Sequence, residues 1–66
     1  MYMAKDQLKI ERKSLNSSLR EIAAIIGIDY SYLCKIENGK IKIRFDSAAK
    51  ISKFYGQSIE ELFNRT

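Results

Sequence analysis

The sequence predicts a small all-α domain of five helices that occupies the whole chain, residues 1–66. Three observations lead to this fold class. The chain has no proline and only three glycines, which favours helices over strands. Its apolar residues recur at helical spacing, and several apolar segments follow a serine or an aspartate that can cap a helix. The content of hydrophobic residues, 45%, argues against disorder, although a chain of this length can bury only a small core.

The first helix is predicted from Lys5 to about Leu15. Leu8, Arg12 and Leu15 recur at helical spacing, and Asn16 can adopt the left-handed conformation that ends a helix. Because this segment is mostly polar, we expect it to depend on packing against the rest of the fold.

The second helix carries the clearest start signal in the chain. Ser17 and Ser18 can provide the N-cap, and Glu21 stands three residues after Ser18, as in a capping box. The helix then shows one apolar stripe, formed by Leu19, Ile22, Ala23 and Ile26.

A tight turn is predicted between the second and third helices. Gly27 can adopt a positive φ, and Asp29 can cap a helix that runs to about Glu37 and ends at Asn38-Gly39. A carboxylate could also accept from a cytosine amino group, but the position of Asp29 fits an N-cap better.

The remaining segments complete the five helices. Lys40–Arg44 is a basic connector, Asp46–Tyr55 a fourth helix ended by Gly56, and Ser58–Phe63 a short fifth helix. The segment Lys40–Phe45 alternates with period two, as an edge strand would. We favour an extended loop, because a lone strand would have no partner in an all-helical fold.

The third helix has two distinct faces when its residues are placed at about 100° intervals. The face expected to meet the core carries Tyr32, Leu33, Ile36 and Glu37. The outward face carries Tyr30, Ser31, Cys34 and Lys35. Apart from Lys35 the outward face is uncharged, which suits a surface that sheds water and meets base edges in a major groove.

The overall charge indicates an anionic partner. Twelve lysines and arginines outweigh eight aspartates and glutamates, for a net charge of +4. The single cysteine cannot form an internal disulfide, and the chain has no histidine, so we expect no metal, no cofactor and a reducing environment. The longest apolar run, Ile22–Ile26, is far shorter than the ~20 residues that cross a bilayer, and Met1–Lys9 lacks the apolar stretch of a signal peptide. We therefore expect a soluble, cytoplasmic protein that does not bind membranes.

Four segments together resemble the Xre, or lambda-repressor and Cro-like, helix-turn-helix family. The resemblance covers about residues 8–63 and rests on Ser18–Ala23, Gly27, Ser31–Lys40 and Ser58–Phe63. It implies a compact five-helix lambda-repressor-like domain whose second and third helices form the helix-turn-helix and whose third helix enters the major groove of double-stranded DNA.

The resemblance also implies roles for individual residues. The implied base-reading residues are Tyr30, Ser31, Cys34 and Lys35. The implied phosphate contacts are Ser18, Leu19 (through its backbone N–H), Arg20, Asn38, Lys40 and Lys42. Arg12 and Glu37 are implied to form a structural ion pair that ties the first helix to the third.

Several of these residues have simpler alternative interpretations. Tyr30 could be an exposed aromatic at a helix start, and the cations after the third helix could belong to a solvated loop. Tyr32 is assigned mostly to packing. Cys34 could act as a redox sensor next to Lys35, but a small side chain without that role is the favoured interpretation.

We expect a sequence-specific transcriptional regulator, and repression by a dimer that binds an inverted repeat is the favoured mode, because one helix contacts only a few base pairs. The expected dimer interface consists of Ile59, Leu62 and Phe63, which exceed what so small a core needs. The alternative is a protein-interaction module with the same fold, such as an antitoxin. An enzyme is disfavoured because no catalytic constellation is present, and RNA binding because no aromatic platform is present.

Overall fold

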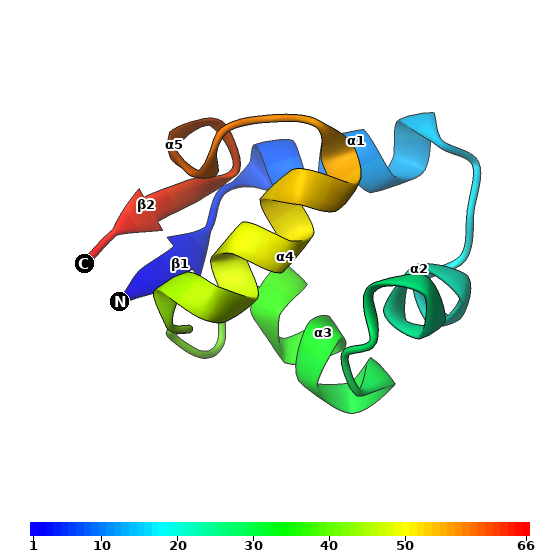
Figure 1. Cartoon of the computed structure of the whole chain (residues 1–66), viewed down its shortest axis with the longest axis horizontal. Coiled ribbons are helices and arrows are strands. Elements are labelled where there is room, and N and C mark those ends of the chain that lie inside the picture. The colour runs from blue at the N-terminus through cyan, green and yellow to red at the C-terminus, as the bar shows by residue number, and fades with distance from the viewer.

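Five short helices pack around one core, and the two ends of the chain pair beside them (Figure 1). The computed structural model describes all 66 residues. In chain order the elements are β1 (Tyr2–Ala4), α1 (Asp6–Ser14), α2 (Leu19–Ile26), α3 (Tyr30–Glu37), α4 (Phe45–Tyr55), α5 (Ile59–Leu62) and β2 (Phe63–Arg65). The five predicted helices are therefore present. None of them has the length and apolar character needed to cross a bilayer.

The all-α prediction holds for the five helices, but it missed a small two-stranded antiparallel sheet that the terminal segments form. Its register pairs Tyr2 with Arg65, Met3 with Asn64 and Ala4 with Phe63. The Thr66 N–H extends the ladder by donating to the Met1 carbonyl at 2.8 Å. Figure 1 shows the two ends of the chain side by side. Strands that are three residues long have no sequence period to detect, and they are stable here because they pack against a core built by the helices.

The basic connector forms no strand of its own, as the prediction of an extended loop implies, but one of its residues pairs with β1. Ile43 and Tyr2 form an antiparallel bridge in which each N–H donates to the other residue's carbonyl at 2.8 Å. Ile43 itself is buried, with 1% of its surface exposed. Within the alternating segment, Ile43 is therefore paired, and its partner is in the N-terminal strand.

The helix starts behave as the sequence predicts. Ser18 forms a complete capping box with Glu21 at the start of α2. Asp29 accepts from the Tyr32 N–H at 3.2 Å at the start of α3. Between these helices Gly27 adopts φ +83°, a conformation that glycine reaches without a steric penalty. These local contacts fix the turn that sets α3 against α2.

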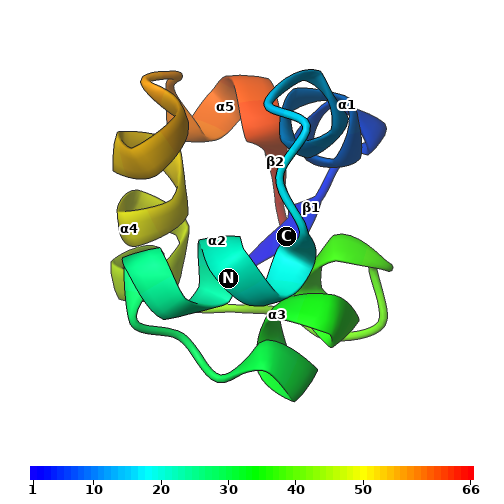
Figure 2. The same cartoon turned by 90° about the vertical axis from the view of Figure 1, so that its right-hand side faces the viewer.

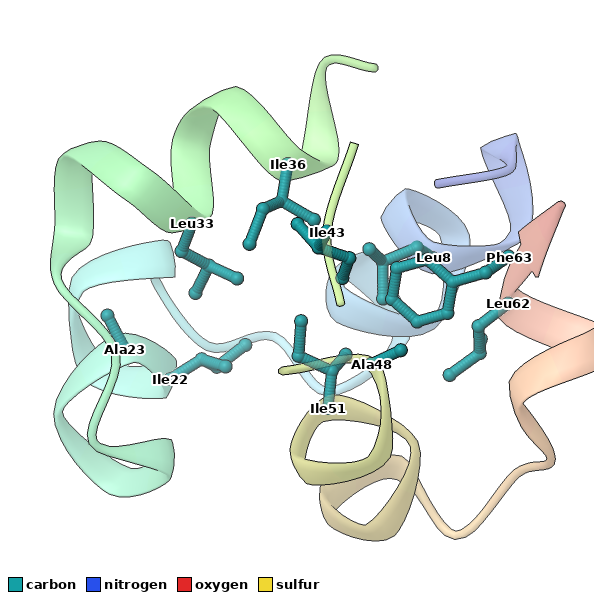
Figure 3. Packing of buried hydrophobic residues seen from close by; sticks show 10 residues of the cluster. All are labelled: Leu8, Ile22, Ala23, Leu33, Ile36, Ile43, Ala48, Ile51, Leu62 and Phe63. Carbon is teal, nitrogen blue, oxygen red and sulfur yellow. The ribbon is translucent and has the colours of Figure 1, made fainter. Parts of the chain in front are cut away.

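The core joins residues from every helix, from β2 and from the connector residue Ile43 (Figure 3). Figure 3 shows the side chains of α2 and α3 meeting those of α4 and α5 in one continuous cluster. The cluster consists of Leu8, Ile22, Ala23, Leu33, Ile36, Ile43, Ala48, Ile51, Leu62 and Phe63. Because α5 and β2 contribute two of these residues, the C-terminal segment is part of the core.

Candidate nucleic-acid interface

The α2–turn–α3 unit places one helix at the edge of the molecule. Figures 1 and 2 both show α3 along the lower edge, beneath α2. Its inner side is anchored by Leu33 and Ile36, whose exposed fractions are 2% and 0%. Figure 3 shows both side chains pointing into the core. The opposite side of α3 is left free for a ligand.

The outer face of α3 contains the four residues that were expected to contact bases. Tyr30, Ser31 and Lys35 are exposed, whereas Cys34 is half-buried. Tyr32 is also exposed, with 38% of its surface accessible compared with 37% for Tyr30. The assignment of Tyr32 to packing was therefore wrong. Its position at the start of α3, where the helix has only just left the turn, lets its ring escape the core.

Arg20 and Tyr30 form a contact that the sequence analysis missed. The Arg20 guanidinium carbon lies 4.2 Å from the centre of the Tyr30 ring, which is a cation–π geometry. Arg20 is in the first turn of α2 and Tyr30 is the first residue of α3, so only the tight turn brings them together. The contact holds a cation and an aromatic ring together where the first turns of α2 and α3 meet.

The start of α2 offers backbone donors to an anion. The N–H groups of Leu19 and Arg20 lie in the first turn, where no intrahelical carbonyl is available to them. The Ser18 hydroxyl is already engaged, since it accepts from the Glu21 N–H at 3.1 Å. The Glu21 carboxylate in turn accepts from the Ser18 N–H at 3.0 Å, and these hydrogen bonds from the Ser18 backbone and side chain hold its pKa below the usual value of 4.5. The start of α2 therefore combines the free N–H groups of Leu19 and Arg20 with the Glu21 carboxylate.

The last turn of α3 and the loop after it carry three cations that form no ion pair. Lys35, Lys40 and Lys42 are exposed, and the molecule's one ion pair, between Arg12 and Glu37, uses none of them. These ammonium groups therefore remain free to meet phosphates.

Asn38, at the end of α3, is held by side chains on both sides. It accepts from the Lys9 ammonium at 3.4 Å and donates to the Cys34 sulfur at 3.7 Å. The contact gives Cys34 a structural role as a small side chain that orients Asn38.

The expected ion pair between α1 and α3 is present. Arg12 Nε lies 2.7 Å from Glu37 Oε1, and Glu37 is buried with 8% of its surface exposed. Tyr55 lies close to the pair, and its burial, together with the negative charge of Glu37, raises the pKa of its phenol to about 12. The pair fixes the C-terminal end of α3 against the rest of the domain, and removing Arg12 would leave a buried carboxylate without a counter-charge.

The expected dimer interface is corrected for two of its three residues. Leu62 and Phe63 have exposed fractions of 0% and 2%, so they belong to the monomer core and are not available to a second chain. Ile59 is half-buried and keeps some surface. The sequence pattern gives no sign of β2, whose pairing places the Phe63 side chain in the core.

The fold and the exposed face of α3 define a helix-turn-helix protein. The family model described as "Helix-turn-helix" matches residues 8–62, and the chain therefore belongs to this family, of the Xre and lambda-repressor type. A protein of Methanocaldococcus jannaschii, named an uncharacterized HTH-type transcriptional regulator, is 34% identical over 59 residues, or 89% of each chain. The crystal structure of a candidate DNA-binding protein from Bacteroides fragilis superposes with a TM-score of 0.76 over 97% of this chain and all of that one, at 16% identity. That structural similarity supports the fold.

Proposed function

We propose that this protein is a sequence-specific transcriptional regulator that binds double-stranded DNA through α3. The observation that carries the proposal is the exposed outer face of α3, held rigidly by its buried inner face and by the Arg12–Glu37 pair. A fixed helix with a mostly uncharged, polar outer face suits a major groove. The naming of the Methanocaldococcus relative as a transcriptional regulator supports the same function.

The contacts divide into two classes in this proposal. Tyr30, Ser31, Cys34 and Lys35 contact base edges and determine sequence preference. The phosphate contacts fix the register of α3 along the duplex. They are the Ser18 hydroxyl, whose proton is free to donate, the backbone N–H of Leu19, the side chains of Arg20 and Asn38, and the cations Lys40 and Lys42.

The cation–π contact refines the role of Arg20. Its guanidinium stacks on Tyr30 and can still donate to a phosphate, since a guanidinium has five N–H donors in its plane. In this arrangement a residue that contacts the backbone also orients a residue that contacts a base. The energetic effects of Arg20 and Tyr30 should therefore not be additive.

We further propose that the protein acts as a dimer on an inverted repeat and represses by occupying a promoter. One recognition helix contacts only a few base pairs, and two half-sites about 34 Å apart multiply affinity and specificity. Ile59 is the residue of the expected interface that can still contact a second chain.

The test is the selection of bound sites from a random duplex library, with binding of the recovered sites measured at two salt concentrations. The proposal predicts an inverted repeat whose half-sites are separated by one helical turn. Recovery of no motif, together with steeply salt-dependent binding to all duplexes, would show that the basic surface binds DNA without sequence preference.

A further inference from the structure

A second surface lies away from the recognition helix. A groove of about 290 Å³ opens between the C-terminal end of α2 and the outer side of α4. Figure 2 shows these two helix segments next to each other, with α3 below them. The groove is lined by Ile25, Ile26 and Phe54, with Lys50 and Lys53.

Three of the five residues that line the groove are hydrophobic. Ile25 is the most exposed large hydrophobic residue of the chain, with 68% of its surface accessible. It directly precedes the half-buried Ile26 and lies across the groove from the half-buried Phe54. A single exposed isoleucine is ordinary, but one that continues into an apolar groove is typical of an interaction site.

The two lysines give the groove a definite charge. Lys50 and Lys53 are one helical turn apart on α4, so their side chains leave the same side of the helix. Neither has a carboxylate within ion-pair distance, because the molecule's one ion pair is Arg12–Glu37. An occupant that combines an apolar side chain with carboxylates would satisfy both the floor and the rim.

The size of the groove favours a protein segment over a small molecule. Pockets that enclose a ligand usually span about 300 to 1,000 Å³ and bury most of its surface. This groove is at the lower limit and is open to solvent, so a small molecule would stay largely exposed. One or two side chains presented by a longer segment need no such enclosure, since the segment adds contacts beyond the groove.

We propose that the groove between α2 and α4 is a docking site for an acidic amphipathic segment of a partner protein. DNA is a poor occupant, because phosphates would match the lysines but leave Ile25 and Phe54 without apolar contacts. The groove is not formed by the outer face of α3, so a partner could dock whether or not the proposed DNA function holds. A regulator bound to DNA would thereby gain a surface on which another protein can be recruited.

The experiment is a titration of the ¹⁵N-labelled full chain with a short helical peptide that has leucines along one face and glutamates beside them. Two further peptides replace the glutamates with glutamine or with lysine. We expect chemical-shift changes centred on Ile25, Ile26 and Phe54, and about fivefold tighter binding of the glutamate peptide than of the glutamine peptide, as expected for two exposed ion pairs. Equal binding of all three peptides, or shifts centred elsewhere, would overturn the proposal.

Matched variants locate the binding. Ile25→Ser should abolish peptide binding, whereas Ile10→Ser should not, although it changes another exposed isoleucine, 56% exposed on α1. The double variant Lys50→Glu, Lys53→Glu should prefer the lysine peptide, and Lys13→Glu should leave the preference unchanged. Retention of the glutamate preference in the double variant would contradict the assignment of the rim.

Two other occupants are distinguished in the same series. If the free protein forms a dimer in sedimentation and Ile25→Ser makes it a monomer, the groove is covered by a second copy and the proposal fails. If Lys50→Gln, Lys53→Gln lowers DNA affinity and reduces the salt slope by about two units, the lysines are phosphate contacts and the proposal also fails. We expect neither result, because neither Ile59, the proposed dimer contact, nor the proposed DNA contacts on α3 line the groove.

Discussion

The helix-turn-helix unit and the terminal sheet differ in how their structure is determined. The unit from Ser18 to Lys40 is specified by contacts between near neighbours, including two caps and one glycine turn. The terminal sheet pairs residues that are 59 to 63 positions apart. The terminal region therefore contributes mainly to stability, whereas the helix-turn-helix carries the proposed DNA-binding surface.

The largest effect is expected in the terminal region. Phe63→Ala should lower the free energy of unfolding by about 3 to 5 kcal/mol, because it removes a fully buried ring from the core. Urea denaturation measures the change. Phe45→Ala, which alters a phenylalanine that is 59% exposed and pairs with the Tyr2 ring at 6.4 Å, should cost less, about 0.5 to 1.5 kcal/mol. Similar losses for the two variants would contradict the placement of Phe63 in the core.

The second prediction concerns the binding surface alone. Tyr30→Ala should weaken binding to the selected site by about 1 to 3 kcal/mol while changing binding to random duplex much less. Fluorescence anisotropy on both duplexes measures the difference. Tyr32→Ala is the matched control, since its exposure is nearly the same but it does not contact Arg20. Equal losses on specific and random DNA for Tyr30→Ala would refute its role in base recognition.

A smaller effect is expected from the loop after α3. Lys40→Ala should weaken binding to all duplexes alike and reduce the slope of affinity against salt by about one unit. Lys13→Ala removes an exposed lysine of α1 and should leave that slope unchanged. Identical slopes for both variants would place the phosphate contacts elsewhere.

The smallest expected effect is a pH dependence of stability that arises at the capping boxes of α2 and α5. Hydrogen bonds from Ser18 and Ser58 lower the pKa values of Glu21 and Glu61 below their usual 4.5. Because the folded-state pKa is the lower one, each carboxylate stabilises the fold above pH 4.5, and this contribution is lost as the pH falls through the lowered pKa. Carbon-detected NMR titration should give both pKa values below 4.5, and Glu21→Gln should reduce the loss of stability in acid. A pKa at or above 4.5 for either residue would show that its capping box is not formed in solution.

The sequence predicted the helices and the exposed face of α3 because their signals lie within a few residues of each other. The Arg12–Glu37 pair was also predicted, through the family resemblance, and its 2.7 Å contact is present. The assignment of Tyr32 to packing failed because a helical wheel places it on the core side, whereas 38% of its surface is exposed at the start of α3.

Contacts between distant residues could not be predicted in the same way. The bridge between Tyr2 and Ile43 and the pairing of Ala4 with Phe63 depend on the completed fold. Missing that sheet contributed to the wrong placement of Phe63 on a dimer surface. The cation–π contact of Arg20 with Tyr30 was missed for the same reason, since only the turn at Gly27 brings the two residues together.

The most direct test of the proposed interface is a map of backbone chemical-shift changes in the full chain on addition of the selected duplex. The account predicts that the largest changes fall on residues 18–20, on the outer face of α3 and on residues 38–42, with small changes in α5 and the terminal sheet. Largest changes in the terminal sheet or on α4, with α3 unaffected, would contradict the assignment of α3 as the helix that contacts DNA.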